Sequence, residues 1–524
     1  MRTCRNQNWK LIPLTEHAIK PAFKWQWLVL AALVGSYLTL AYMIPPGADT
    51  LWRLHIARGI LDGQTLYRDV IEVNPPLWFW AAIPAASLGG YAALVAINLV
   101  ATLTGLAIFG ALARLTLDVK GQWAAILGLA AGLLLVNVAE IGQREQAFLL
   151  ACALWSGLAA ARIEGKTVPI WLALLATCFA AYGFALKHYF VLVPVAIEAF
   201  VIWHKRRTWK PFRPETLLLA GLAGLYALAV IYLTPDYLGR VLGLVQASYF
   251  GFGPSNVVSS SEFQNRIVKI SAFILGPVIA LVITRDNRPL ICALLLALLI
   301  SIATIILQEK YWRYHYIAGT GLSIVIVAMT LQLVFAYKPR FISQGILLLT
   351  MAGIIWLGFV QPLTSNLKSD GQPINFELKN IVNQEPLHNH IVILSIAPER
   401  AFLPLAREKR SHWSRHYSMW MMPGLLTPQS DLIKQALKNK ERDYVRDEFT
   451  QDIMCTPPDL IVGEVGYLRN SSRTLFNAML FLRSNTVFDK WLDSAYVQKP
   501  DISRYPIWRL KGAKPAPQNC AKPR

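Results

Sequence analysis

Long apolar segments recur through the first two thirds of the chain and constrain its fold more than any other feature. A helix that crosses a bilayer core needs roughly 20 apolar residues. Eleven segments qualify, and they lie near 26–45, 90–114, 122–138, 146–162, 168–185, 188–204, 215–234, 266–284, 288–307, 316–337 and 341–360. Only 16% of the 524 residues are charged, against about 25% in soluble domains. The sequence therefore predicts a mainly α polytopic membrane protein with about 11 transmembrane helices.

Two further features of the chain complete this topology. The shorter apolar piece 77–87 predicts a juxtamembrane or re-entrant helix, because it is too short to cross the bilayer. The net charge of +20 comes from basic residues in short loops, which is typical of cytoplasmic loops in membrane proteins and not of nucleic-acid binding. We therefore expect the bilayer, and no nucleic acid, as a partner.

Basic residues also predict which loops face the cytoplasm. Five Lys or Arg residues precede residue 25, and the loop 204–213 reads HKRRTWKPFR, so we expect residues 1–25 and this loop to be cytoplasmic. Counting from them places one group of segments on the opposite face: 45–76, 139–145, 186–187, 235–265, 308–315 and everything after 361. The loops that are rich in polar and aromatic residues thus share one side of the membrane.

The C-terminal region, 363–524, has a different composition from the transmembrane domain that we assign to 26–362. It is polar and contains no apolar segment long enough to span a bilayer. Residues 390–396, 459–465 and 505–510 are typical of short strands, and 429–452 is typical of a helix. We expect a small α/β extracytoplasmic domain. Its two cysteines, Cys455 and Cys520, could form a disulfide if the domain faces an oxidising compartment.

The first loop, 45–76, carries the strongest candidates for chemistry. Asp49 follows the first apolar segment and could act as a general base, or it could cap the helix that follows. Glu72 precedes the pair Pro75-Pro76 and could bind a metal or orient an acceptor, or it could be a solvated acid. Asn74 and Arg58, in the same loop, are candidates for substrate binding.

Three later junctions between apolar segments carry further candidates for substrate binding. Charged groups are expensive at the end of a span and often functional there, although interfacial pairing and snorkelling would explain them too. These candidates are Arg144 and Glu145 in AEIGQREQAFLL, Lys187 and His188 in GFALKHYFVLVP, and Lys310, Arg313 and His315 in QEKYWRYHYIAG. The cations among them suit a lipid phosphate.

Two other motifs indicate less. The loop 235–265 is rich in Gly, Ser and aromatic residues and could cover a substrate. His412 and His416 are spaced like metal ligands on a helix, but the sequence offers no third ligand, and we assign no metal site. A divalent metal shared by the acids of the first loop stays possible.

In the order of these landmarks, residues 26–360 resemble the GT-C membrane glycosyltransferases, which use polyprenyl-phosphate-linked sugars. The aminoarabinose transferases and the protein O-mannosyltransferases belong to this class. Asp49 falls where that family keeps a catalytic Asp, and LYRDVIEVNPPLWFW resembles its loop ending in an acid, a short spacer and Pro-Pro. LKHYFVLVP and EKYWRYHYI resemble its later cationic segments. The chain departs from the family pattern at Thr50, where many members have Glu, and at Asn74, where several have Lys.

The resemblance implies an enzyme in which Asp49 is the general base and Glu72 is a second catalytic carboxylate. Its partners would be a polyprenyl-phosphate-linked sugar and an envelope lipid, glycan or protein acceptor, and it would lie in a bacterial inner membrane. Two alternatives remain open at this point. A transporter or flippase of a lipid-linked saccharide would also explain charges near the membrane, and so would a structural assembly factor.

Overall fold

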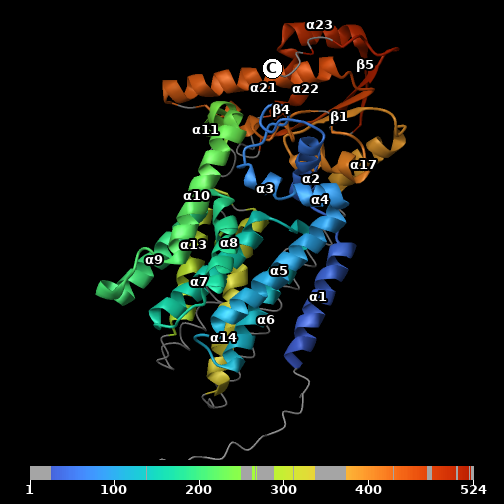
Figure 1. Ribbon diagram of the computed structural model, residues 1–524. Coiled ribbons are helices and arrows are strands. Elements are labelled where there is room, and N and C mark those ends of the chain that lie inside the picture. Colours follow the sequence, from blue (N-terminus) through green and yellow to red (C-terminus); the bar gives the residue numbers. More distant parts are fainter. Residues whose placement is uncertain are drawn as a thin grey trace, which may run out of the picture.

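A computed structural model shows a bundle of apolar helices that carries a smaller α/β region at one end (Figure 1). It describes residues 25–136, 138–249, 263–265, 267, 288–310, 312–336, 373–412, 414–428, 430–468, 475–502, 505–517 and 520. The predicted spans near 266–284 and 341–360 fall outside the described residues, apart from Ile267.

Six helices of the described ranges are long and apolar enough to cross a membrane. They are α1 (Trp25–Met43), α5 (Tyr91–Ala113), α7 (Arg144–Ile163), α10 (Pro214–Leu233), α13 (Pro289–Gln308) and α14 (Ile317–Ala336), which continues the 3-10 turn η5 (Arg313–Tyr316). Three other predicted spans form shorter helices, which are α6 (Val119–Leu135), α8 (Ile170–Ala185) and α9 (Leu192–Lys205). A multi-pass membrane protein is therefore supported, but the count of about 11 spans is not confirmed.

The buried centre of the bundle is α7, which packs against α5, α8, α9, α13 and α14. The helices α6 and α14 approach each other closely because small residues face their contact. A Cβ on Gly132 would lie 2.9 Å from the Cα of Gly321, so any larger side chain there would push the helices apart. By contrast, α1 and α10 leave most of their surface uncovered, as lipid-facing helices do.

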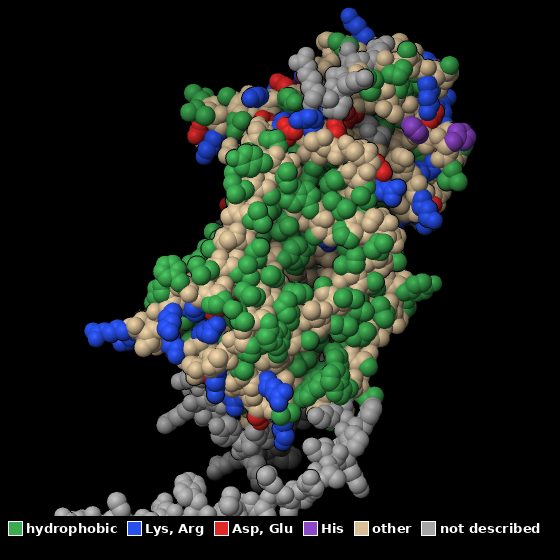
Figure 2. Space-filling model, viewed as in Figure 1, with side chains coloured by type: hydrophobic (Ala, Val, Ile, Leu, Met, Phe, Trp, Pro, Cys, Tyr) green, Lys and Arg blue, Asp and Glu red, His purple; other side chains and the backbone are tan. Residues whose placement is uncertain are grey.

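Charged side chains gather at the two ends of the bundle, and an apolar band lies between them (Figure 2). One end holds the described loops predicted to be cytoplasmic. The other holds α2 (Ala48–Leu61), the short helices α3 (Leu77–Trp80) and α4 (Ile83–Leu88), and the C-terminal region (Figure 1). The apolar piece 77–87 thus forms two short helices and not a span.

The C-terminal region contains a four-stranded sheet of order β1-β2-β6-β5, in which β1 and β2 are parallel and the other pairs antiparallel. Its strands are β1 (Ile391–Leu394), β2 (Leu460–Gly463), β5 (Tyr496–Ile502) and β6 (Tyr505–Leu510), and β3 (Val465–Tyr467) pairs with β4 (Leu475–Asn477). Every residue of β1 and β2 is buried, which explains their continuous apolar sequences. The predicted strands are confirmed.

In the described part of the C-terminal region, seven helices accompany these strands. They are α17 (Pro373–Gln384), α18 (Pro398–Ala401), α19 (Leu403–Arg407), α20 (Met422–Leu426), α21 (Leu432–Cys455), α22 (Ala478–Arg483) and α23 (Thr486–Ala495). The long helix α21 matches the helix expected over 429–452. A disulfide joins its last residue, Cys455, to Cys520, so the pairing left open by the sequence does occur.

The first loop and the segment after α10 connect the bundle to the C-terminal region. The backbone N–H of Ile71 donates to the carbonyl of Arg415 at 2.7 Å. The segment 237–248, which lies in the loop expected over 235–265, is helical instead. It comprises the π-helix η4 (Tyr237–Val241) and α11 (Leu242–Ser248), which packs against α20 and α21. Residues 250–262 lie outside the described ranges.

Candidate active site

A cavity of about 350 Å³ opens at the end of the bundle where α2 and the C-terminal region meet. Six segments that are distant in sequence contribute to its walls. The lining residues are Ala48, Asp49, Trp52, Glu72, Val73, Asn74, Trp78, Glu140, Arg144, Lys187, Tyr249, Lys310, Trp312, Arg313, Tyr314, Pro398, Glu399, Tyr417 and Trp420. The structure thus brings both proposed catalytic acids and five of the nine proposed substrate-binding residues to one cavity.

Asp49 lies in the first turn of α2 and points toward other side chains. The N-cap of α2 is Gly47, so the capping role that the sequence allowed for Asp49 does not apply. The carboxylate of Asp49 accepts hydrogen bonds from Nε2 of Gln143 at 3.2 Å and from the hydroxyl of Tyr417 at 3.4 Å. Burial raises the pKa of Asp49 to about 6, although the Arg144 guanidinium opposes the shift. Asp49 is therefore poised near neutral pH, as a general base should be.

Glu140 is a second acid beside Asp49, and it was not among the predicted site residues. It belongs to the 3-10 turn η1 (Val138–Glu140), which precedes α7. Nε2 of Gln143 donates to Glu140 and to Asp49, at 3.2 Å each, and so bridges the two carboxylates. Burial, followed by the charge of Asp49, raises the pKa of Glu140 to about 8. At neutral pH this pair therefore holds one proton, chiefly on Glu140.

Glu72 is held by four hydrogen bonds. Its carboxylate accepts from the indole N–H of Trp52 at 2.8 Å and from the backbone N–H of Val73 at 2.8 Å. It also accepts from the backbone and side-chain N–H groups of Asn74, at 3.0 and 2.6 Å. Because the carboxylate of Glu72 accepts all these hydrogen bonds, Glu72 is suited to holding the side chains of Trp52 and Asn74 in position.

Arg144 reaches the cavity from the start of α7. Its guanidinium donates to the side-chain carbonyl of Asn74 and lies over the ring of Trp78, 4.5 Å from the ring centroid. The position of Trp78 is fixed in turn by Arg53, whose Nε donates to the Trp78 carbonyl at 2.8 Å. Arg53 is a buried residue that the sequence analysis missed, because its place in an amphipathic helix gave no signal of its role.

Lys187 projects into the cavity from the junction of α8 and α9. Its ammonium group donates to Glu145 at 2.6 Å and to Gln308 at 2.9 Å, and all three side chains are buried. Burial lowers the pKa of Lys187 to about 8, and Glu145 partly offsets this shift. Glu145 therefore supports Lys187 from behind the cavity wall. Lys310 also lines the cavity, and its Nζ donates to the carbonyl of Tyr249 at 2.7 Å.

Three predicted substrate-binding residues lie away from this cavity. Arg58 is exposed and pairs with Asp62, at 3.4 Å, on the outer face of α2. His188 is exposed beside the ring of Tyr189. His315 is buried, and its Nδ1 lies 3.3 Å from the Lys310 carbonyl. Adjacent residues on a helical turn point in different directions, so His188 and His315 each follow a cavity residue, Lys187 and Tyr314, without reaching the cavity themselves.

The sequence also offered two possible metal sites, and the geometry favours neither. Within the described ranges, no group of three His, Cys, Asp or Glu residues has the arrangement to hold a metal ion. His412 and His416 are not on a helix, and Nε2 of His416 is 2.7 Å from Glu448. The carboxylate of Glu72, the other candidate ligand, accepts four hydrogen bonds from Trp52, Val73 and Asn74.

Comparison with solved structures identifies the fold. ArnT from Cupriavidus metallidurans in the apo state matches with a TM-score of 0.57 and 11% identity, over 92% of this chain and 97% of that chain. ArnT bound to undecaprenyl phosphate matches with the same score and identity, over 94% and 99%. The Archaeoglobus fulgidus oligosaccharyltransferase in the apo form gives 0.43 and 13%, over 75% and 64%. No protein family and no curated protein matches by sequence.

The chain therefore has the fold of ArnT, an aminoarabinose transferase, over almost its full length. The GT-C fold expected from the sequence is confirmed by this likeness.

Proposed function

We propose that this chain is an integral membrane glycosyltransferase. It moves a sugar from a polyprenyl-phosphate donor to an envelope lipid, glycan or protein acceptor. One observation carries the proposal: a half-buried acid poised near neutral pH shares a cavity at the end of the bundle with buried cations. The ArnT fold supports the donor class, since one ArnT structure contains undecaprenyl phosphate.

The cations would hold the lipid phosphate. Lys187, Arg144 and either Lys310 or Arg313 line the cavity. In the described part of the chain, Nε of Arg144 is buried and has no hydrogen-bond partner. A buried donor without a partner costs about 1–3 kcal/mol, and a phosphate oxygen would satisfy it. These fixed charges would also stabilise the phosphate as it leaves, which is the kind of preorganised electrostatics that dominates many rate enhancements.

Asp49 would act as the general base. An acceptor hydroxyl attacks the anomeric carbon of the sugar, and its proton passes to Asp49. The bond between that carbon and the phosphate oxygen breaks, so polyprenyl phosphate leaves and the anomeric configuration inverts. Protonated Glu140 would keep a second negative charge from developing beside Asp49. Glu72 would act indirectly, by positioning Trp52 and Asn74.

The membrane orientation is part of the proposal. We place the cavity on the non-cytoplasmic face of a bacterial inner membrane. The disulfide between Cys455 and Cys520 supports this orientation, because disulfides persist mainly in oxidising compartments. A transporter fits less well, because its site is expected near the middle of the membrane. Here the charges that line the cavity belong to one end of the bundle.

Mass spectrometry of envelope lipids and glycans tests the proposal. A deletion strain should lack one sugar modification, which returns when the wild-type gene is supplied. Complementation with Asp49→Asn should not restore it, whereas Asp62→Asn should, because Asp62 is an exposed acid at the C-terminal cap of the same helix. An envelope that is identical with and without the gene would exclude this function.

A further inference from the structure

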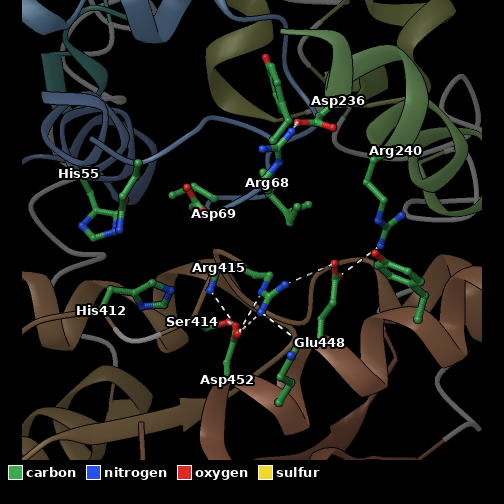
Figure 3. Close-up of a pocket in the computed structure, with 16 residues that line it drawn as sticks. His55, Arg68, Asp69, Asp236, Arg240, His412, Ser414, Arg415, Glu448 and Asp452 are labelled. Atoms are coloured by element: carbon green, nitrogen blue, oxygen red, sulfur yellow. Dashed lines mark hydrogen bonds and ion pairs between the residues drawn. The ribbon is translucent and has the colours of Figure 1, made fainter. Parts of the chain in front are cut away.

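A second, larger cavity lies beside the candidate active site and shares no lining residue with it. Its volume is about 830 Å³, within the range of ligand pockets. Figure 3 shows its walls. His55, Arg68 and Asp69 come from α2 and the first loop, and Asp236 and Arg240 lie beside α10. The opposite wall belongs to the C-terminal region, with Arg415 and α21.

An aromatic stack separates the two cavities. The ring of Trp52 lies between His55, at a centroid distance of 5.1 Å, and Tyr417, at 4.7 Å. His55 lines the second cavity, whereas Trp52 and Tyr417 line the first. The first loop divides in the same way, because 69–71 line one cavity and 72–74 the other. A molecule in the second cavity would therefore lie next to the wall that holds Asp49.

Each of the three guanidinium groups that line the second cavity is paired with a carboxylate, and the lining also includes Asp69, whose carboxylate accepts the backbone N–H of Thr65 at 2.7 Å. Arg68 pairs with Asp236 at 2.9 Å, and Arg415 pairs with Asp452 at 2.6 Å. The third guanidinium, Arg240, contacts Glu441 at 2.6 Å and Glu448 at 3.2 Å.

The two histidines of the second cavity, His55 and His412, add no positive charge to it. Burial lowers the pKa of His55 to about 4 and that of His412 to about 3, so both rings are neutral at pH 7. With every guanidinium paired, the cavity does not attract a phosphate. Its paired guanidinium and carboxylate groups can donate to and accept from hydroxyl groups.

The cavity continues along α21 as a groove. A neighbouring cavity of about 790 Å³ shares Arg415, Tyr444, Glu448 and Gln451 with it and extends to Asn485. The half-exposed ring of Tyr444 lies under the guanidinium of Arg240, 3.9 Å from it. The groove is thus elongated, and polar residues outnumber apolar ones along it, with the aromatic ring of Tyr444 at its middle. Its apolar residues, Val70, Ile71, Met454 and Val487, line the same walls as charged and amide side chains.

We propose that this groove, formed by the cavities on both sides of Tyr444, binds an uncharged oligosaccharide. This inference rests on the proposed function, and it means that the acceptor is a molecule that carries an oligosaccharide. Sugar units remote from the reacting hydroxyl occupy the groove, behind the Trp52 stack. The donor phosphate stays in the first cavity, where the cations are.

Direct binding to the full-length protein in nanodiscs tests this inference. The probe is a fluorescently labelled envelope oligosaccharide from the deletion strain, freed of phosphate. Gln451→Trp should fill the groove, and Tyr444→Ala should remove its aromatic face. Each should weaken binding at least ten-fold. The matched controls, Lys490→Trp on α23 and Tyr467→Ala on β3, change exposed residues outside the groove and should bind like wild type.

Three outcomes would overturn the inference. The first is that the oligosaccharide does not bind to the wild-type protein. The second is equal binding by both groove variants while their Tm values match wild type. The third is displacement of the probe by inorganic phosphate or by a labelled decapeptide mixture, which would indicate an anionic or a peptide ligand.

Release of polyprenyl phosphate from the donor is measured in parallel. If wild type and groove variants release it equally but the oligosaccharide does not bind, only this inference fails; if wild type releases none, the proposed function fails.

Discussion

At the scale of single residues, the site depends on acids and cations whose ionisation burial has shifted. The pKa of Asp49 is raised to about 6, and that of Lys187 is lowered to about 8. Transfer needs Asp49 without its proton and Lys187 with its proton. We therefore predict that kcat/KM rises with pH through about 6 and falls through about 8, which gives a bell-shaped profile. A profile that is flat between these two values would contradict the assigned roles.

The pair of Lys187 and Glu145 allows binding and stability to be separated. Lys187→Met should weaken binding of undecaprenyl phosphate and lower the Tm, because it leaves Glu145 buried without its cation, at a cost of about 3–5 kcal/mol. The double variant Lys187→Met/Glu145→Gln should recover the Tm but not the affinity. Titration of nanodisc-embedded protein with undecaprenyl phosphate checks this. Wild-type affinity in the double variant would remove Lys187 from the phosphate site.

Sequence reasoning found the residues that were conspicuous by their chemistry. Asp49, Arg144 and Lys187 are charged groups next to long apolar segments. Because placing a charge there costs free energy, each was predicted to have a function. Glu140 stood in the same stretch as Arg144, but the sequence does not show where the turn η1 ends and α7 begins. Tyr417 was missed for another reason: it comes from a region without a recognisable motif and reaches Asp49 only through tertiary folding.

At the scale of elements, the start of α2 depends on a glycine. A Cβ on Gly47 would lie 2.8 Å from the carboxylate of Glu140. Because Glu140 is flexible and the backbone of Gly47 suits alanine, Gly47→Ala should displace Glu140 without unfolding the protein. We predict a kcat about ten-fold lower at an unchanged Tm, within the effect of one misplaced catalytic neighbour. Gly35→Ala, which changes a glycine with open space around it, is the control, and an unaltered kcat in Gly47→Ala would argue against a role for Glu140.

Elements were predictable where hydrophobic pattern decides the structure. The long spans and the buried strands β1 and β2 follow from continuous apolar sequence. Helix length was less predictable, since α9 has 14 residues where a full span was expected. The helical segment 237–248 was taken for a loop, because its packing against α20 and α21 outweighs its Gly and aromatic content.

At the scale of the whole molecule, the proposed function requires one orientation in the membrane. Cysteines introduced at Lys499, on the exposed strand β5, and at Lys205, at the end of α9, report on the two ends. The four native cysteines outside the pair Cys455–Cys520, which are Cys4, Cys152, Cys178 and Cys292, are first replaced by serine. A membrane-impermeant maleimide should label Lys499→Cys in intact spheroplasts and Lys205→Cys only after permeabilisation. The reverse pattern would place the cavity in the cytoplasm.

The proposed function depends on one cavity, formed by residues distant in sequence, in which cations would hold a lipid phosphate and Asp49 would remove a proton. The most direct test is the release of polyprenyl phosphate by purified protein, from donor lipids extracted from the deletion strain and in the presence of acceptor. Asp49→Asn should slow release about 10²–10⁴-fold, the usual contribution of a general base. Its affinity for undecaprenyl phosphate should stay unchanged, and Asp62→Asn should react like wild type. Release by Asp49→Asn at the wild-type rate would contradict the claim.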